Sequence, residues 1–254
     1  MGGRHVQDAA RLMTEALDGP ERDGPKQDGL VRAARAVVAE LGSAERLLPL
    51  VRDLAAGAGD PSGCALLSYR HVLGFDKLLL IDGGPRHMLR AHVWHPGRGT
   101  REDIHNHRSP LSSYVVRGAL GMELYEPAGP GADEGVAAAW YRESLTGDEG
   151  DWHLEPAGDA RLRLVQSARY TAGSGYALPP HVLHRAWCDS ARPTVTLFLE
   201  TGAGRRRYTD VFAGEGAGAD DAAGRAVAKK PLEVNDYLAE LAALADLLTE
   251  GPAD

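Results

Sequence analysis

The sequence predicts an all-β sandwich or barrel that carries helices at both ends. Short runs rich in branched and aromatic residues, among them KLLLID, MLRAHVW, SYVVRG, MELYE, RLRLVQ and TVTLFLE, follow one another between residues 66 and 212. Gly, Pro and Asp residues separate these runs. Several short strands divided by turn residues are typical of sandwiches and barrels, whereas helical periodicity is confined to the flanking segments.

The first segment, residues 1–65, is predicted to be a helical extension of the barrel. After a first helical run, DAARLMTEAL, a longer one covers residues 28–57. Asp28 is placed to cap its start, and Gly57 is placed to stop it. Apolar residues recur at helical spacing near its beginning, and they are Leu30, Val31, Ala34, Val37, Val38 and Leu41.

The last segment, residues 213–254, combines a Gly-rich linker with a C-terminal helix. Residues 213–224, AGEGAGADDAAG, hold too few apolar groups to fold alone and are interpreted as a flexible connection. The run PLEVNDYLAELAALADLLTEG then carries leucines on a broad helical stripe that Gly251 and Pro252 end. Because this stripe must be buried, it packs either on the barrel or on a second subunit, and the second case is a homodimer.

Composition restricts the partners of the protein. Lys and Arg total 28 against 36 Asp and Glu, which leaves a formal charge of −8, so the chain lacks the excess of positive charge that binds nucleic acid or an anionic membrane. No apolar run has the length of a membrane helix, and the N-terminus lacks the core of a signal peptide, which predicts a cytoplasmic protein. Cys64 and Cys188 are too few for a disulfide framework. We therefore expect a small-molecule partner.

Two histidines form the clearest candidate for chemistry. His105 and His107 stand in IHNHRSPLSSYVVRGAL, and residues two apart on a strand point to the same face. The pair is thus placed to chelate a metal, although an HxH pair alone is a weak signal. A second cluster, His181 and His184, follows in GSGYALPPHVLHRAW. Since these two are three residues apart, only one of them is expected to point inward on an extended segment.

These two clusters resemble the two motifs of the cupin superfamily. Gly99 precedes the HxH pair, Gly118 closes the next strand, and a later histidine follows a turn with Gly and Pro. The resemblance covers residues 66–212 and implies a cupin barrel of the double-stranded β-helix, or jelly-roll, type. It implies that His105, His107 and His184 are the metal ligands, with His181 as the rival of the third.

One departure from the common cupin pattern concerns a fourth ligand. Most cupins carry a glutamate four or five residues after the second histidine, where this chain has Leu111 and Ser112. A three-histidine site is similar to that of the thiol dioxygenases, the cysteine dioxygenase group, which implies Fe(II) and O2. Three neutral imidazoles leave the metal charge uncompensated and leave positions for a chelating anion and O2. The ligand type alone also suits a catalytic zinc site.

Other residues are candidates for roles around the metal. Tyr114 or Tyr125 is expected to position the oxygen intermediate. Arg70, in SYRH, matches the thiol dioxygenase arginine that binds the substrate carboxylate, and Arg90 offers the same bidentate fork. His92, on an expected strand, either reaches the pocket or is a hydrogen-bonded core histidine.

Two further stretches bear on the surroundings of the metal. A Ser-x-His-x-Tyr segment lines the pocket of the thiol dioxygenases, and TVTLFLE places Thr196, Phe198 and Glu200 there, so the substrate is expected to differ from cysteine. Glu102 and Asp103 precede the ligand pair and are interpreted as contacts around the ligands or with solvent rather than as ligands.

The sequence therefore predicts a mononuclear non-heme Fe(II) dioxygenase that oxidises a small polar metabolite, a thiol, an enol or an electron-rich ring, in specialised metabolism. Two rivals stay open. One is a non-redox isomerase, lyase or hydrolase that uses Zn, Ni or Mn, and the other is a ligand-binding cupin without turnover.

Overall fold

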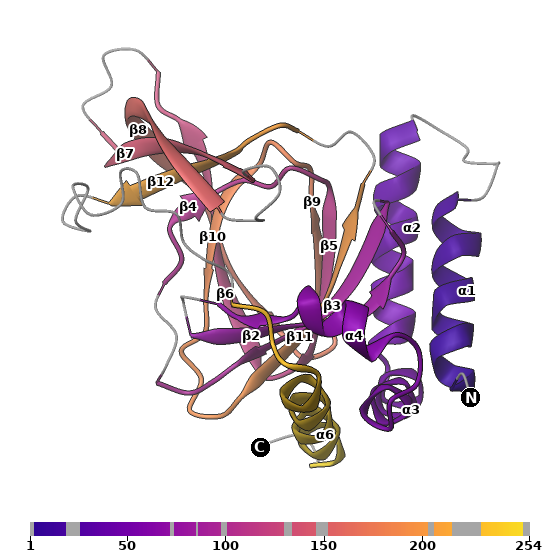
Figure 1. Cartoon of the computed structure of the whole chain (residues 1–254). Helices are drawn as coiled ribbons and strands as arrows, with labels where there is room; N and C mark the ends of the chain where they lie inside the picture. The colour runs from indigo at the N-terminus through magenta and orange to yellow at the C-terminus, as the bar shows by residue number, and fades with distance from the viewer. Residues whose placement is uncertain are drawn as a thin grey trace.

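The chain forms two antiparallel β-sheets with helices on one side (Figure 1). The computed structural model describes residues 3–18, 26–71, 74–84, 86–97, 101–129, 134–145, 152–202, 206–214 and 230–250. The predicted runs of branched and aromatic residues are all strands, which confirms the all-β core.

The first sheet has six strands. Their order across the sheet is β1 (Tyr69–Arg70), β2 (Phe75–Asp82), β3 (His87–Trp94), β11 (Thr194–Thr201), β5 (Leu111–Arg117) and β9 (Gly175–Leu178). The second sheet closes on itself as a barrel. Its order is β10 (Leu183–Trp187), β4 (Ile104–His105), β12 (Thr209–Gly214), β7 (Val136–Leu145), β8 (Trp152–Thr171) and β6 (Ala119–Pro127).

Eight of these strands make a jelly roll. Strands β3, β11, β5 and β9 lie side by side in the first sheet, and β4, β10, β6 and β8 contribute to the second. The chain alternates between the sheets as it runs from β3 to β6 and again from β8 to β11, which is the winding of two packed Greek keys. Gly118 makes the turn between β5 and β6 with a φ of 76°, a conformation that suits glycine. The predicted jelly-roll barrel is confirmed.

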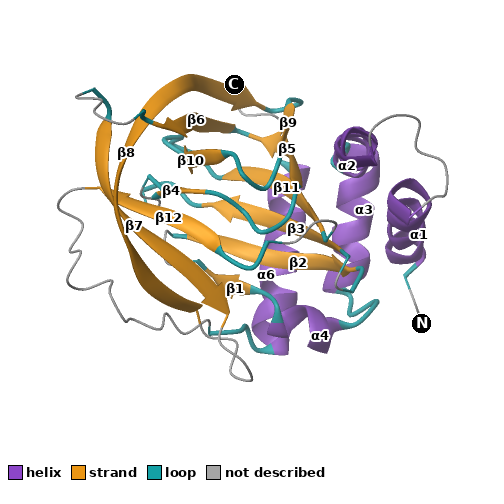
Figure 2. Cartoon of the chain, turned by 90° about the horizontal axis from the view of Figure 1, so that it is seen from above, coloured by secondary structure: helices purple, strands orange, loops and turns teal. Residues whose placement is uncertain are grey.

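The two remaining strands of the second sheet, β7 and β12, give that sheet a second interior. β7 pairs with β8 and with β12, and β12 pairs with β4, so the sheet curls away from the first sheet and closes where β10 meets β6. Figures 1 and 2 show β7, β8 and β12 on the side of the molecule opposite the helices. Strands β4, β10 and β6 therefore form a wall shared by two interiors, that of the jelly roll and that of this small barrel.

The helices cover the outer face of the first sheet (Figure 2). They are α1 (Arg4–Asp18), α2 (Lys26–Leu41), α3 (Ala44–Ala55), α4 (Pro61–Leu66) and α6 (Val234–Thr249). Their apolar stripes join the outward side chains of β2, β3 and β11 in one buried cluster. Burying such stripes is what stabilises amphipathic helices in a folded protein.

The expected helix over residues 28–57 is in fact two helices. Helix α2 already begins at Lys26, so Asp28 lies inside it and is not its cap. The helical run is interrupted at Gly42 and Ser43, where a side chain on Gly42 would collide with the ring of Tyr114. Helix α3 ends at Ala55, and Gly57 follows with a φ of 83°, as the predicted stop requires.

The C-terminal helix packs within the chain. Tyr237, Leu241, Leu244 and Ala245 of α6 are buried in the cluster beneath the first sheet, and the hydroxyl of Tyr237 donates a hydrogen bond of 2.6 Å to the carbonyl of Leu79. Most of the expected linker, like the pair at 251 and 252, lies outside the described residues.

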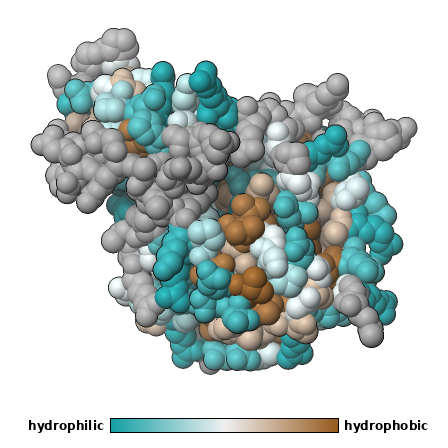
Figure 3. All heavy atoms as spheres, in the orientation of Figure 1, coloured by the Kyte–Doolittle hydropathy of each residue, from teal (hydrophilic) through white to brown (hydrophobic). Residues whose placement is uncertain are grey.

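Among the described helices, none has both the length and the apolar character that crossing a bilayer requires. Figure 3 shows apolar residues gathered in the middle of the face seen in Figure 1, with polar residues around them.

Candidate metal centre

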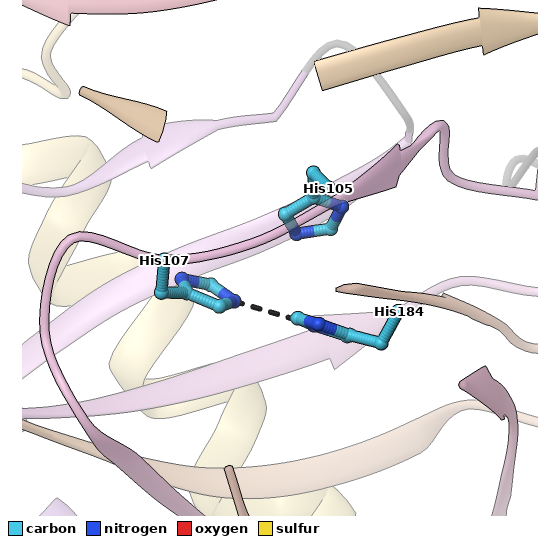
Figure 4. Close-up of side chains that lie close together, drawn as sticks. All are labelled: His105, His107 and His184. Atoms are coloured by element: carbon cyan, nitrogen blue, oxygen red, sulfur yellow. Dashed lines mark hydrogen bonds between the residues drawn. The ribbon is translucent and has the colours of Figure 1, made fainter. Parts of the chain in front are cut away.

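Three histidines meet on the inner face of the wall, inside the jelly roll. His105 ends β4, His107 follows two residues later, and His184 is the second residue of β10. His105 and His184 are direct partners across the two strands. One ring nitrogen from each of the three lies within 4.8 Å of those of the other two, and Figure 4 shows the rings turned toward a common point. Within the described residues, this is the group that can hold a metal ion.

The orientation of the imidazoles suits a metal. Nδ1 of His105 lies 2.8 Å from the carbonyl oxygen of Asp103, and Nδ1 of His184 lies 3.2 Å from that of Val182. Hydrogen bonds of this kind fix the tautomer and leave Nε2 as the ligand atom. Nε2 of His107 is 3.3 Å from Nε2 of His184. Two nitrogens that each bind one ion at ~2.0–2.1 Å are separated by about 3 Å, so the group fits a metal.

The protonation state of the group also suits a metal. Burial, and then the neighbouring histidines His184 and His105, lower the pKa of His107 well below its usual value. Burial, and then His105, lower the pKa of His184 to about 3. Both imidazoles are neutral at pH 7, and a histidine must be neutral to bind a metal.

Aromatic rings form the wall next to the histidines. The ring of Phe198, on β11, lies 5.9 Å from that of His107 and 4.7 Å from that of His92. His92 also contacts Phe75 at 5.5 Å, and Phe75 stacks on Trp94 at 4.0 Å. The predicted pocket position of Phe198 thus faces the metal centre.

His92 is a buried residue of this same interior. Its side chain lies between the rings of Phe75 and Phe198, and its Nε2 has no hydrogen-bond partner among the described residues. Nε1 of the neighbouring Trp94 is in the same situation. His92 therefore lies in the buried interior beside the metal centre, with one ring nitrogen unpaired among the described residues. A buried polar atom without a partner is available to a ligand.

Lys77 is a residue of the interior that the sequence motifs did not single out. It pairs with Tyr69 on one side and with His92 on the other, and its Nζ lies 5.5 Å from the centre of the Phe75 ring. Its charge contributes to the lowered pKa values of His92 and His107. The signal in the sequence is a lysine two residues after Phe75, on the same face of a strand whose centre is apolar.

The two cations on this side of the barrel differ in their partners. Arg90 donates to Glu200 over 2.7 Å, so its charge is compensated by a residue of the neighbouring strand. Lys77 forms no ion pair with a carboxylate in the described part of the chain. Lys77, rather than Arg90, therefore offers a free positive charge to the interior.

Tyr114 lies on the wrong face for the predicted catalytic role. Leu111 and Val115 of β5 point into the jelly roll, whereas Tyr114 belongs to the cluster under the helices and its ring packs against Gly42 at the end of α2. The alternation of side chains along the strand sets this orientation. The prediction for Tyr114 is wrong because it takes no account of which face its strand presents to the metal.

Tyr125 is also turned away from the histidines. It is the partner of Leu183 across β6 and β10, on the face opposite His184. Its hydroxyl donates a hydrogen bond of 2.6 Å to Glu123, and burial and this bond raise the pKa of Tyr125 to about 12. Glu123 also accepts from Arg185 at 2.7 Å. Tyr125 is therefore part of a network on the small-barrel side of the wall, and the prediction of a metal-side role is wrong.

Arg70 is an exposed residue of the outer face. Its guanidinium donates to Glu240 of α6 at 2.8 Å and lies 3.5 Å from Asp76. Because Asp76 points away from the interior that Phe75 and Lys77 line, Arg70 ties β1 to the last helix. The prediction that Arg70 binds a substrate carboxylate is wrong.

The structure also locates the remaining candidate residues of the sequence motifs. His181 is exposed, away from the group, and Leu111 is buried where other cupins carry a glutamate. Glu102 accepts from the backbone N–H of Ala186, and Asp103 holds His105 through its carbonyl. Gly99 lies outside the described residues.

The comparisons with known proteins are distant. No family model matches the sequence, and no curated protein matches it. Among solved structures, KdgF from Halomonas sp. is 18% identical with a TM-score of 0.31, over 52% of this chain and 81% of that one. An RmlC-like cupin from Shewanella frigidimarina is 17% identical with a TM-score of 0.31, over 54% and 83%. Hydroquinone 1,2-dioxygenase PnpCD is 14% identical with a TM-score of 0.31, over 59% and 70%.

The topology and the site of this chain define its class. Two four-stranded layers in jelly-roll order enclose three converging imidazoles, so the protein has a cupin barrel with a three-histidine group that can hold a metal. The barrel carries helices before and after it, as the sequence predicts.

Proposed function

We propose that the protein is a mononuclear Fe(II)-dependent dioxygenase that acts on a small anionic metabolite, a thiol, an enol or an electron-rich ring. The observation that carries the proposal is the convergence of His105, His107 and His184 in a group that, among the described residues, includes no carboxylate. Three neutral ligands on one side of a metal leave its charge uncompensated and its other positions open. An Fe(II) held there supplies the activation of O2 toward a substrate bound beside it.

Lys77 supports an anionic substrate. Its positive charge faces the interior that the histidines share. Glu200 pairs with Arg90, whereas among the described residues no carboxylate forms an ion pair with Lys77. An anion that binds the metal through one group and reaches Lys77 with a carboxylate is compensated at both ends. Ionic hydrogen bonds of this kind are the stronger ones in proteins.

His92 and the aromatic wall complete the pocket. Burial first, and then Lys77 and Arg90, lower the pKa of His92 well below its usual value, so this imidazole is neutral and can exchange a hydrogen bond with a polar group of the substrate through Nε2. Phe198 and Phe75 pack on its two sides and exclude water from it. Exclusion of water protects reactive intermediates from side reactions.

A non-redox enzyme with Zn(II), Ni(II) or Mn(II) is the second candidate, because three imidazoles 3.3 Å apart or more suit a tetrahedral zinc site as well. Loading the protein anaerobically with Fe(II) or Zn(II) and recording O2 uptake with a panel of anionic thiols, enols and catechols separates the two. We expect uptake with iron alone. Bound zinc with turnover and no O2 uptake would support the second candidate, and binding without turnover would support a non-catalytic cupin.

The role of Lys77 is tested on the same assay. In Lys77→Met we expect KM for the anionic substrate to rise about tenfold or more, because a charged hydrogen bond is lost. Arg70→Met is the matched control, since Arg70 is on the outer face, and it should keep the KM of the unaltered protein. Equal KM values for both variants would contradict the assignment of Lys77.

A further inference from the structure

The small barrel holds a second cavity, on the other side of the wall from the histidines, that is open to solvent. Its volume is about 630 Å³. Among the described residues, its lining includes none of the three histidines of the metal centre. Strands β6, β7, β8, β10 and β12 contribute to the lining, which includes Tyr125, Trp140, Leu162, Leu183 and Phe212.

Strand alternation explains why this second interior exists. His184 points into the jelly roll, and the residue before it, Leu183, points into the small barrel together with Ile104 and Tyr125. Each strand of the wall thus presents ligands on one face and apolar side chains on the other. The interior of the small barrel is consequently lined by apolar side chains, as a hydrophobic core is, but it contains a cavity.

The walls of the cavity are mainly apolar and include the aromatic rings of Tyr125, Trp140 and Phe212. The rings of Trp140 and Phe212 are nearly parallel, at 11°, with their centres 6.1 Å apart. Leu162 and Leu183 are buried in the same cluster. Apolar and aromatic walls with a few polar groups are typical of small-molecule sites, which have volumes of roughly 300–1,000 Å³.

The charged groups at the floor of the cavity are already paired. Asp210 accepts hydrogen bonds from Asn106 at 2.8 Å, from Arg206 at 2.9 Å and from Nε1 of Trp140 at 3.1 Å. The charge of Arg206 is therefore compensated, in contrast to that of Lys77. At this floor an ionic ligand would find no unpaired counter-charge, and its desolvation there would be uncompensated. The other ionisable residues of the lining, Glu126, Asp159 and His181, are exposed to solvent.

The closed barrel also restricts the kind of occupant. A peptide that binds a sheet usually adds a strand at a free edge, and β10 pairs with β6, so the sheet offers none there. The cavity is open to solvent, with exposed residues such as Val165 in its lining, so a small molecule can enter it directly.

We propose that the small barrel is a second ligand site, separate from the metal centre, for an uncharged aromatic or alicyclic small molecule. Such a ligand inserts a ring among Trp140, Phe212 and Leu162 and leaves the Asp210 network intact. The site stands whether or not the chain is a dioxygenase.

The metal-free protein and a neutral probe, N-phenyl-1-naphthylamine, test this proposal by fluorescence titration. We expect saturable binding at one site, with energy transfer from Trp140 that is reduced in Trp140→Phe. Ala160 lines the cavity, and in Ala160→Phe the probe should bind about tenfold more weakly, because the new ring takes its place. Ala137→Phe is the matched control on the paired strand β7, since Ala137 is not part of the lining, and it should bind as the unaltered protein does.

A second variant keeps the test decisive if Ala160→Phe does not fold, as judged by its melting curve. Val165 lines the cavity and is 41% exposed, so Val165→Glu is expected to fold and to weaken binding of the neutral probe by adding a charge. The proposal is wrong if the unaltered protein shows no saturable binding. It is also wrong if every folded variant binds the probe as tightly as the unaltered protein, or if the signal comes only from a dimer that forms as the probe is added.

Discussion

The two interiors on either side of the wall of β4, β10 and β6 are built from alternate residues of the same strands and have opposite character. The jelly-roll side holds three converging imidazoles, an uncompensated Lys77 and stacked rings. The small-barrel side holds apolar walls and a carboxylate, Asp210, whose hydrogen bonds are made within the protein. The jelly-roll side is thus suited to a metal ion and an anionic ligand, and the small-barrel side is suited to an uncharged ring.

The comparison shows that the alternation of side chains along a strand is enough to place a polar metal-binding site and an apolar cavity on opposite faces of the same strands. Asn106 illustrates this, because it stands between His105 and His107 and yet its side chain bonds to Asp210 on the small-barrel side. In the tripeptide His105, Asn106 and His107, a histidine motif identifies only the two residues that face the metal centre. The structure shows that Asn106 faces the other way and lines the second cavity.

Neighbouring residues on β10 give the largest expected contrast. In His184→Ala we expect metal binding to fall by more than the ~10–100-fold that outer-sphere changes cause, because a ligand is removed. Leu183→Ala removes the adjacent side chain on the opposite face and should leave one metal bound per chain. Metal content after dialysis, measured by elemental analysis, checks both. Loss of metal in Leu183→Ala with the fold retained would contradict the separation of the two faces.

Replacing one buried leucine in each interior by alanine compares how tightly the two interiors are packed. Leu111 is buried among the rings of the jelly roll, and we expect Leu111→Ala to lower the free energy of unfolding by ~2–5 kcal/mol. Leu162 is equally buried but borders the cavity of the small barrel, so Leu162→Ala should cost less, toward the lower end of that range. Urea unfolding curves measure the difference, and a larger cost for Leu162→Ala would show that the cavity is not open.

A substitution of Asn106 tests whether the small-barrel side positions the metal ligands His105 and His107, because it alters neither histidine. Asn106→Ala removes the hydrogen bonds that Asn106 exchanges with Asp210, so the histidines beside it are less well positioned and metal affinity should fall about tenfold. Trp140→Phe removes another donor to Asp210 from the cavity side and should leave metal affinity unchanged. Competition with a fluorescent chelator measures both affinities. Equal losses in the two variants would mean that the whole Asp210 network, and not Asn106 alone, positions the ligands.

The smallest expected effect is a change in pH dependence. Burial holds the pKa of His92 below its unfolded value of 6.5, so the unfolded chain binds the proton more readily. This contribution to stability is complete above pH 6.5 and is lost as the pH falls below it. In His92→Phe the melting temperature of the metal-free protein should therefore decline less between pH 7 and pH 5. Calorimetry at several pH values checks this, and an unchanged decline would assign the pH dependence to other groups.

Much of the fold was predictable because it rests on local patterns. The strands of residues 66–212 and the last helix follow from short-range periodicity. The pair His105 and His107 follows from its spacing, and His184 follows from the resemblance of two short motifs to those of cupins. The break at Gly42 and Ser43 was missed because the apolar helical spacing continues across it.

The sequence by itself determined the strand-rich core, the helical ends and the pair His105 and His107, since each depends on the order of neighbours along the chain. The jelly-roll type of barrel and the third ligand, His184, came from the resemblance to cupin motifs. Only the tertiary structure decided which side of each strand faces the metal. It turned Tyr114 toward the helices, Tyr125 toward Glu123 and Arg70 toward Glu240, and it brought Lys77 and His92 into the interior. The physical reason is that side chains alternate along a strand, so the role of each residue depends on strand register and on which sheet or helix covers each face.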